Sequence, residues 1–178
     1  DQHQSQIVIQ EFRPFFENKE IEKIGHNLKY DLKVLLKNQI IVEGPLFDTM
    51  IAHYLINPDM RHNMNILAET YLNYKPQSIT ELIGKKGKNQ ISMREVDLVK
   101  QTEYSVEDAD ITFQLKHYFQ RELSNANTIS LYDKVELPLV KVLASMESEG
   151  INLDTQFLKE LSKTLFSDIK ILEKNIFE

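Results

Sequence analysis

The hydrophobic residues of the chain recur mostly at steps of three and four, the spacing that places side chains on one face of a helix. Two short segments, residues 21–26 and 40–42, instead have the composition of strands. The pattern therefore predicts a mainly helical chain with a small amount of sheet. The predicted helices cover residues 6–18, 28–37, 47–56, 66–72, 93–123, 135–149 and 154–176.

The predicted helix at residues 28–37 places a carboxylate beside its apolar stripe. Asn27 is a suitable N-cap residue for this helix. Asp31 points from the edge of the leucine stripe rather than from the solvent face, and a carboxylate in that position needs a partner. Asp48 is the most direct N-cap for the next helix. The face opposite the stripe is interpreted as a solvated surface, and it carries Lys29, Lys33 and Lys37.

Residues 103–110 concentrate four carboxylates and a tyrosine near the start of the longest predicted helix. Tyr104 and Asp108 are four residues apart, so they share one helix face. Oxygen ligands at this spacing suit a hard divalent cation such as Mg²⁺ or Mn²⁺. A purely structural interpretation is also open, because acidic side chains near a helix start interact favourably with the helix dipole.

Two other features of the middle of the chain predict structure rather than chemistry. His53 and His62 are nine residues apart across the Asn57 and Pro58 helix breaker, which is not a metal-pair spacing, so both are interpreted as structural or solvated. Residues 84–90 form a basic, glycine-rich loop. This loop lacks the Lys-Ser/Thr ending and the strand and helix context of a phosphate-binding P-loop.

Composition narrows the class of function. The chain has no cysteine, which excludes disulfides, thiolate metal sites and cysteine nucleophiles. Residues 1–6 lack the basic and apolar regions of a signal peptide, and no apolar run has membrane-spanning length, so we expect a cytoplasmic protein. A net charge of −6 argues against a broad nucleic-acid-binding face, so any nucleic acid has to be held locally.

A polar break at residues 124–127 is the candidate domain boundary. It divides the chain into residues 1–125 and residues 126–178. The two amphipathic helices beyond the break, the second capped by Asp154, leave apolar faces without a partner. The chain also begins without methionine, and we expect it to be a fragment of a larger protein.

Several motifs in one consistent order resemble the family A DNA polymerases, the bacterial DNA polymerase I family. Residues 25–31, GHNLKYD, resemble the second motif of the 3′→5′ exonuclease domain, and residues 104–108, YSVED, resemble its third, Tyr-x-x-x-Asp motif. Residues 135–154 resemble the beginning of the polymerase thumb. Intervening family segments are similar to residues 47–50, 61–64 and 87–90.

This resemblance implies an α/β fold, namely the later part of a ribonuclease H-like exonuclease domain, N-terminally truncated and so mostly helical, followed by two long helices of the polymerase domain. The implied activity is proofreading hydrolysis of DNA by two Mg²⁺ or Mn²⁺ ions in a parent DNA-directed DNA polymerase. Asp31 and Asp108 would be metal ligands, and Tyr104 would orient the attacking water. Residues that match family contacts to a single-stranded 3′ end are Asn27, Tyr30 and Arg61. The implied partner is DNA, with no membrane and no small-molecule cofactor.

The chain also departs from the family pattern. The first exonuclease motif, an Asp-x-Glu that supplies metal ligands, does not occur in it, so we expect the isolated fragment to be inactive. His26 and Ile79 stand where the family commonly has a glutamine and an aromatic residue. Two alternatives remain open: an exonuclease fold kept only as a scaffold, and a ribonuclease D-like enzyme acting on RNA. The thumb-like residues 135–154 argue against the second alternative.

Overall fold

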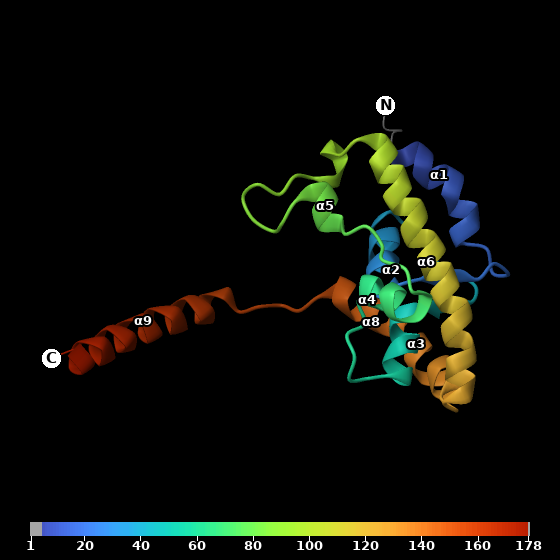
Figure 1. Cartoon of the computed structure of the whole chain (residues 1–178). Coiled ribbons are helices and arrows are strands. Elements are labelled where there is room, and N and C mark those ends of the chain that lie inside the picture. The colour runs from blue at the N-terminus through green and yellow to red at the C-terminus, as the bar shows by residue number, and fades with distance from the viewer. Residues whose placement is uncertain (1–4, 178) are drawn as a thin grey trace. The chain divides into compact units, whose positions relative to one another are not determined.

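The computed structural model describes residues 5–177, which belong to two compact units, Asp1–Ser148 and Glu149–Glu178 (Figure 1). The expected lack of a signal peptide concerns residues that lie largely outside this range. The fold of the described part is mostly helical, as the sequence predicts. Its elements are α1 (Ser5–Phe16), β1 (Lys23–Gly25), α2 (Leu28–Lys37), β2 (Leu46–Asp48), α3 (Thr49–Ile56), α4 (Met64–Leu67), the π-helix η1 (Ala68–Leu72), α5 (Ile79–Ile83), the 3₁₀ turn η2 (Met93–Glu95), α6 (Leu98–Asn125), α7 (Ile129–Leu131), the π-helix η3 (Tyr132–Glu136), α8 (Leu137–Glu149) and α9 (Thr155–Phe177).

The sheet of the described residues consists of two short parallel strands, β1 and β2. The pairing runs from Lys23 opposite Leu46 to Gly25 opposite Asp48. Parallel strands need a crossover connection, and α2 supplies it. Because both strands run in the same direction, the residues that follow Gly25 and Asp48 emerge at the same edge of the sheet.

The predicted strand at residues 40–42 is wrong, because the sheet of the described residues pairs β1 with β2, and the next residue, Glu43, bonds to the end of α1 and to Lys23. The amide of Glu43 donates to the carbonyl of Phe16 at 3.0 Å, and the Lys23 ammonium donates to the Glu43 carbonyl at 2.7 Å. Gly44 has a φ of 81°, and a Cβ on it would lie 2.8 Å from two carbonyl oxygens of the turn after α1. Ile40 and Val42 are buried, so their apolar character reflects burial rather than strand pairing, whereas Ile41 is exposed.

The main hydrophobic core of the first unit lies between α6, α3 and the sheet (Figure 1). α6 contributes a stripe of side chains that are at most 2% exposed, namely Ile111, Leu115, Phe119 and Leu123. Complete burial of one large apolar side chain contributes roughly 1.5–3 kcal/mol. The remaining buried members of this core are Phe47, Ala52, Leu67, Ala68 and Tyr132.

The long helix begins at Leu98, later than residue 93, where the apolar pattern places its start. Ser92 and Glu95 form a reciprocal capping box around the single turn η2. Asp97 then begins α6 by accepting a hydrogen bond from the amide of Val99 at 3.0 Å. Two successive caps thus divide one periodic pattern into two elements. Residues 103–110 consequently lie more than one turn inside α6.

The chain beyond α6 still packs against the first unit. Tyr132 is 1% exposed, and its ring lies 5.2 Å from that of Phe47. Its hydroxyl accepts a hydrogen bond from the amide of Asp48 at 2.7 Å. In α8, Val140 is buried against the second apolar cluster of this unit. The compact unit therefore extends to the end of α8, and the boundary after residue 125 stays a prediction.

Two lysines of the row on α2, expected to be solvated, form ion pairs. Lys29 and Lys33 contact the carboxylate of Glu147 in α8 at 2.5 and 2.8 Å. The hydrogen bonds from these two lysines lower the pKa of Glu147 to about 2. The paired charges lie at the surface, where screening keeps such contacts weak, so they orient α8 more than they stabilise it.

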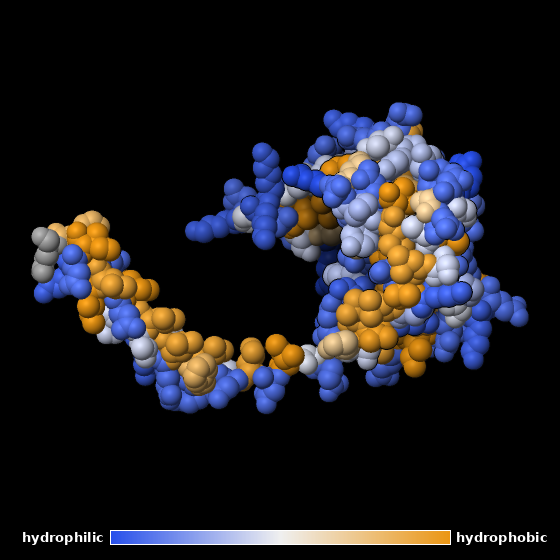
Figure 2. Space-filling model, turned by 90° about the horizontal axis from the view of Figure 1, so that it is seen from below, coloured by the Kyte–Doolittle hydropathy of each residue, from blue (hydrophilic) through white to orange (hydrophobic). Residues whose placement is uncertain are grey.

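The second unit consists of α9 and the segment that precedes it. Asp154 caps α9, as predicted, by accepting from the amide of Phe157 at 2.9 Å. An apolar band follows the helix (Figure 2) and includes Leu158, Leu161, Leu165, Ile169, Leu172 and Ile176. Among the described residues, no helix combines the length and apolar character needed to cross a membrane.

Candidate functional site

Asp31 and Asp108 line one cleft of about 520 Å³ in the first unit. α2 carries Asp31, and α6 carries Asp108. The end of β1 contributes Gly25, and His26 follows it in the wall of the cleft. The other lining residues are Phe15, Glu22, Ile24, Met64, Ala109, Thr112 and Phe113. Two carboxylates that are 77 positions apart in the sequence thus face the same small volume.

The start of α2 is held by Asp48, whereas the predicted cap, Asn27, does not act as one. Asn27 has a φ of 67°, a left-handed conformation that asparagine tolerates, and its side chain makes no capping hydrogen bond. The Asp48 carboxylate instead accepts from the amides of Asn27 at 3.2 Å and Leu28 at 2.7 Å. It also accepts from two amides in the first turn of α3, at 2.9 and 3.3 Å, which confirms its predicted role there. One buried carboxylate therefore fixes α2, and with it Asp31, against α3.

Both cleft carboxylates have a raised pKa. Desolvation by the surrounding protein raises the pKa of Asp31, although part of its side chain stays accessible, and the negative charge of Asp48 adds to the effect. Desolvation is also the largest cause of the raised pKa of Asp108, which is half-buried. Within residues 5–177, neither carboxylate forms an ion pair with a lysine or arginine. Desolvation in the cleft therefore disfavours the charged forms of Asp31 and Asp108, and a bound cation would favour them.

Tyr104 lies one turn before Asp108 on the same face of α6. Its pKa is raised to about 12, first by desolvation and then by the charge and hydrogen bonding of the Asp108 carboxylate. The hydroxyl therefore keeps its proton at neutral pH and is a donor to a carboxylate or a water, not a base. The hydrogen bond from Tyr104 in turn lowers the pKa of Asp108, in opposition to desolvation.

The helix-dipole interpretation of the acidic segment does not hold. α6 has no acidic residue in its first turn, because it begins at Leu98. The segment also divides between two faces of the helix. Asp108 lines the cleft described above, while Glu103, Glu107 and Asp110 line a separate hollow.

None of the three residues predicted to contact nucleic acid is in the lining of the cleft. Asn27 is the residue after His26, and Tyr30 precedes Asp31 on α2 with 66% of its surface exposed. An exposed aromatic ring beside the cleft suits stacking on a base. Arg61 is exposed in the turn between α3 and α4. Their contacts to a substrate stay predictions.

A buried histidine network behind the cleft was not predicted as a unit. His53 is fully buried, and its Nε2 lies 2.9 Å from the hydroxyl of Tyr71. Its Nδ1 lies 2.7 Å from Nδ1 of His62, so both histidines take part in contacts within the fold. His26 Nδ1 pairs with the Thr49 hydroxyl at 2.9 Å. The signal that reveals this network is spatial, since nothing in the spacing of these residues indicates a contact.

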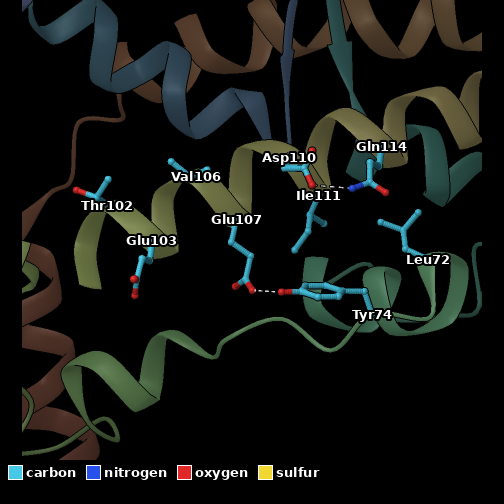
Figure 3. Close-up of a pocket in the computed structure, with 9 residues that line it drawn as sticks. All are labelled: Leu72, Tyr74, Thr102, Glu103, Val106, Glu107, Asp110, Ile111 and Gln114. Atoms are coloured by element: carbon cyan, nitrogen blue, oxygen red, sulfur yellow. Dashed lines mark hydrogen bonds between the residues drawn. The ribbon is translucent and has the colours of Figure 1, made fainter. Parts of the chain in front are cut away.

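The hollow on the other side of α6 has a volume of about 660 Å³ (Figure 3). Its Glu107 is already engaged: one oxygen accepts from the Tyr74 hydroxyl at 2.5 Å, and the other accepts from the Gln77 amide at 2.8 Å. Asp110 accepts from the side chain of Gln114 at 2.6 Å. The two hydrogen bonds of Glu107 therefore attach the segment around Tyr74 and Gln77 to α6.

The chain offers only part of a metal-binding shell. Among residues 5–177, no three histidine, cysteine or acidic side chains come together in a cluster that holds a metal ion. Asp31 and Asp108 are nevertheless hard oxygen donors in one cleft, which is the donor type that Mg²⁺ and Mn²⁺ take. The residues present therefore fit a divalent cation by the chemistry of their oxygen donors.

Comparison with protein families places this chain among nucleases. A family model described as 3′-5′ exonuclease matches residues 1–124. The chain belongs to this 3′→5′ exonuclease family, whose members generally use divalent metal ions. Over 96% of its length the chain is also similar to DNA polymerase I from two bacteria, at 36% identity for *Borreliella burgdorferi* and 38% for *Chloroflexus aurantiacus*. It spans 18% of the length of each of those proteins.

A solved structure supports the fold. The polymerase domain of Pol1 from *M. smegmatis*, in complex with a DNA primer-template and dNTP, superimposes with a TM-score of 0.74. The match covers 95% of this chain and 26% of that one, at 20% sequence identity. The arrangement of helices described above is therefore shared with a part of that polymerase.

Proposed function

We propose that this chain is the exonuclease region of a bacterial DNA polymerase I, working in the cytoplasm, and that it removes nucleotides from the 3′ end of DNA during proofreading. One observation carries the proposal: Asp31 and Asp108, brought by separate helices, line one cleft in a chain of the 3′→5′ exonuclease family. The relatives named DNA polymerase I support the choice of parent protein.

Asp31 and Asp108 would hold divalent ions, Mg²⁺ or Mn²⁺, two of them in the complete site. Bound ions supply the activation of a water and the stabilisation of the leaving oxygen of a phosphodiester. The carboxylates themselves would do the binding, and desolvation is the largest cause of the raised pKa of each. Both would become better metal ligands as the pH rises through their pKa values.

Tyr104 would orient the attacking water. Its raised pKa of about 12 keeps the hydroxyl protonated, so it donates a hydrogen bond and does not remove a proton. Tyr30 would stack on a terminal base, and Asn27 and Arg61 would hold the terminal nucleotides through polar and phosphate contacts. A grip of this kind is local and does not require a basic protein.

Metal binding by the chain tests the first part of the proposal without any assay of activity. Mn²⁺ titrated into the full chain should selectively broaden the NMR signals of residues around Asp31 and Asp108. Asp108→Asn and Asp31→Asn should each weaken this effect at least tenfold. Asp110→Asn is the matched control, because Asp110 is on the same helix but in the other hollow. Equal Mn²⁺ affinity in all four proteins contradicts the assignment of the ligands.

Hydrolysis tests the second part in the complete protein encoded by the gene that carries this sequence. With Mg²⁺, Asp31→Asn or Asp108→Asn should abolish removal of 3′ nucleotides from single-stranded DNA and leave primer extension nearly unchanged. No hydrolysis by the unmodified protein would instead support the scaffold alternative. Faster hydrolysis of an RNA strand of the same sequence would support the ribonuclease D-like alternative.

A further inference from the structure

Residues 78–92, here called the basic arm, contain α5 and form a short projection that precedes the start of α6 (Figure 1). Ser78 caps α5 by accepting from the amide of Thr80 at 3.3 Å. The amide of Ile91 donates to the carbonyl of Ile83 at 3.0 Å and closes the neck of the arm. The tip, residues 84–90, is therefore a closed loop held at its base, with hydrophilic side chains pointing outward (Figure 2).

The tip carries an uncompensated positive charge. Its cationic side chains are all exposed, and in the described part of the chain none of them forms a salt bridge. They are Lys85, Lys86 and Lys88. Gly87, between them, has a φ of 155°, and a Cβ built on it meets nothing within 4 Å, so the tip is open to an incoming ligand. In a chain of net charge −6, three cations within four residues are a local exception.

Both roots of the arm attach to α6 close to the candidate site. At one root, the Gln77 amide bonds to Glu107, the residue beside Asp108. At the other root, the Gln101 side chain donates to the carbonyl of Val96 at 2.8 Å. The start of α6 lies about 15 Å along the helix axis from Asp108, at 1.5 Å per residue. Because a strand rises about 3.4 Å per nucleotide, a few nucleotides span the distance from Asp108 to this root of the arm.

The hollow lined by Glu103, Glu107 and Asp110, here called the acidic hollow, limits the path of such a strand. Glu103 and Asp110 repel phosphates from the hollow. The carboxylate of Glu107 is stabilised in place by the hydrogen bonds that it accepts from Tyr74 and Gln77. The lysine-bearing tip, by contrast, attracts a phosphate.

We propose that the tip of the basic arm binds the phosphate backbone of the single strand whose 3′ end occupies the Asp31–Asp108 cleft. The inference rests on the proposed function and adds a contact outside the catalytic cleft. Lysine ammonium groups act as point charges toward phosphates, so the contact holds the strand without reading its sequence. It also reconciles an acidic protein with a polyanionic substrate, because the attraction is confined to one loop.

Salt dependence of binding tests this inference in the full chain. Fluorescence anisotropy would measure the affinity for a labelled strand of about ten nucleotides, within the usual range for single-strand sites. Neutralisation of the three tip lysines should reduce the slope of log affinity against log salt by about 2, since each phosphate contact on a single strand contributes about 0.7. The tip variant is Lys85→Gln, Lys86→Gln and Lys88→Gln. The control with the same net charge is Lys19→Gln, Lys37→Gln and Lys134→Gln, three exposed lysines elsewhere in the first unit.

The expected result is a shallower slope for the tip variant and an unchanged slope for the control. Equal slopes in the tip variant and the unmodified chain overturn the inference, as does an equal loss in both variants, which reflects total charge alone. Failure of the proposed function is distinguishable. In that case Asp31→Asn and Asp108→Asn leave hydrolysis by the complete protein unchanged, whatever the slopes of the lysine variants.

Discussion

Nδ1 of His53 lies 2.7 Å from Nδ1 of His62, which ties the turn between α3 and α4 to the buried core. The contact requires one proton between the two nitrogens, with one ring donating and the other accepting. Because Nε2 of His53 pairs with Tyr71, both nitrogens of this buried ring are engaged. Arg61 directly precedes His62, so the contact between His53 and His62 also constrains the position of Arg61.

The histidine pair should make stability depend on pH. Desolvation is the largest cause that lowers the pKa of His53 from 6.5 to about 4, and electrostatic interactions with His62 and His26 lower it further. The unfolded chain therefore binds a proton at higher pH than the folded chain. We expect the free energy of unfolding to fall between pH 6.5 and 4, by at most roughly 3 kcal/mol for this group. Urea unfolding across this range measures the loss.

His53→Gln should be less stable at neutral pH but should lose less stability on acidification. His117→Gln is the control, because His117 is exposed on α6. The same dependence on pH in His53→Gln and His117→Gln would show that other groups dominate acid unfolding.

Asp48 should be one of the most sensitive positions in the chain. Its carboxylate caps α2 and α3 together, and it is 1% exposed. Loss of one helix cap costs about 1 kcal/mol, so Asp48→Ala should cost roughly 2–4 kcal/mol with the buried amides left unpaired. Asp97→Ala, which removes the single exposed cap of α6, should cost about 1 kcal/mol. Denaturant unfolding measures the loss of stability in each variant. Equal losses in the two variants would contradict the role of Asp48 as a cap for two helices.

Tyr104→Phe separates packing from chemistry. The change keeps the ring and removes the hydroxyl that bonds to Asp108. In the complete protein, single-turnover hydrolysis of a short DNA strand should slow by roughly ten- to a thousand-fold, the range that orientation and proton-transfer effects supply. The melting temperature should barely move. An unchanged rate would leave Tyr104 as a packing residue.

Glu147 should titrate at unusually low pH. Its hydrogen bonds from Lys29 and Lys33 lower its pKa to about 2. Carbon-detected NMR at low ionic strength should follow this titration directly, and salt near 1 M should move the pKa toward its ordinary value by screening the pair. Lys29→Gln together with Lys33→Gln should have the same effect as salt. A pKa that responds to neither change would mean that the contact does not persist in solution.

Local pattern predicts much of this fold. The leucine stripe defines the limits of α2, and the helical period puts Tyr104 and Asp108 on one face of α6. Asp154 begins α9 as its position suggests. Each of these results depends on residues within a few positions of one another, where helix geometry alone determines which side chains are neighbours.

Long-range contacts explain where sequence reasoning fails. Asn27 has the right chemistry for a cap, but the amides at the start of α2 donate instead to Asp48, 21 positions later in the sequence. Residues 40–42 have the composition of a strand, yet they lie outside the sheet, and the amide of the next residue, Glu43, donates to the carbonyl of Phe16 at the end of α1. Neither competitor is visible in a local pattern. The shared cleft of Asp31 and Asp108 is likewise set by tertiary packing, and the family resemblance, not periodicity, indicates it.

The contact between Tyr132 and Asp48 has a consequence for how the protein is made. The two residues are 84 positions apart, and Tyr132 fills the core beside Phe47. On the ribosome, the first strands and helices emerge well before the side chain that covers them. The nascent unit therefore exposes part of its apolar interior until α7 and η3 have left the exit tunnel, an interval in which chaperone binding competes with closure.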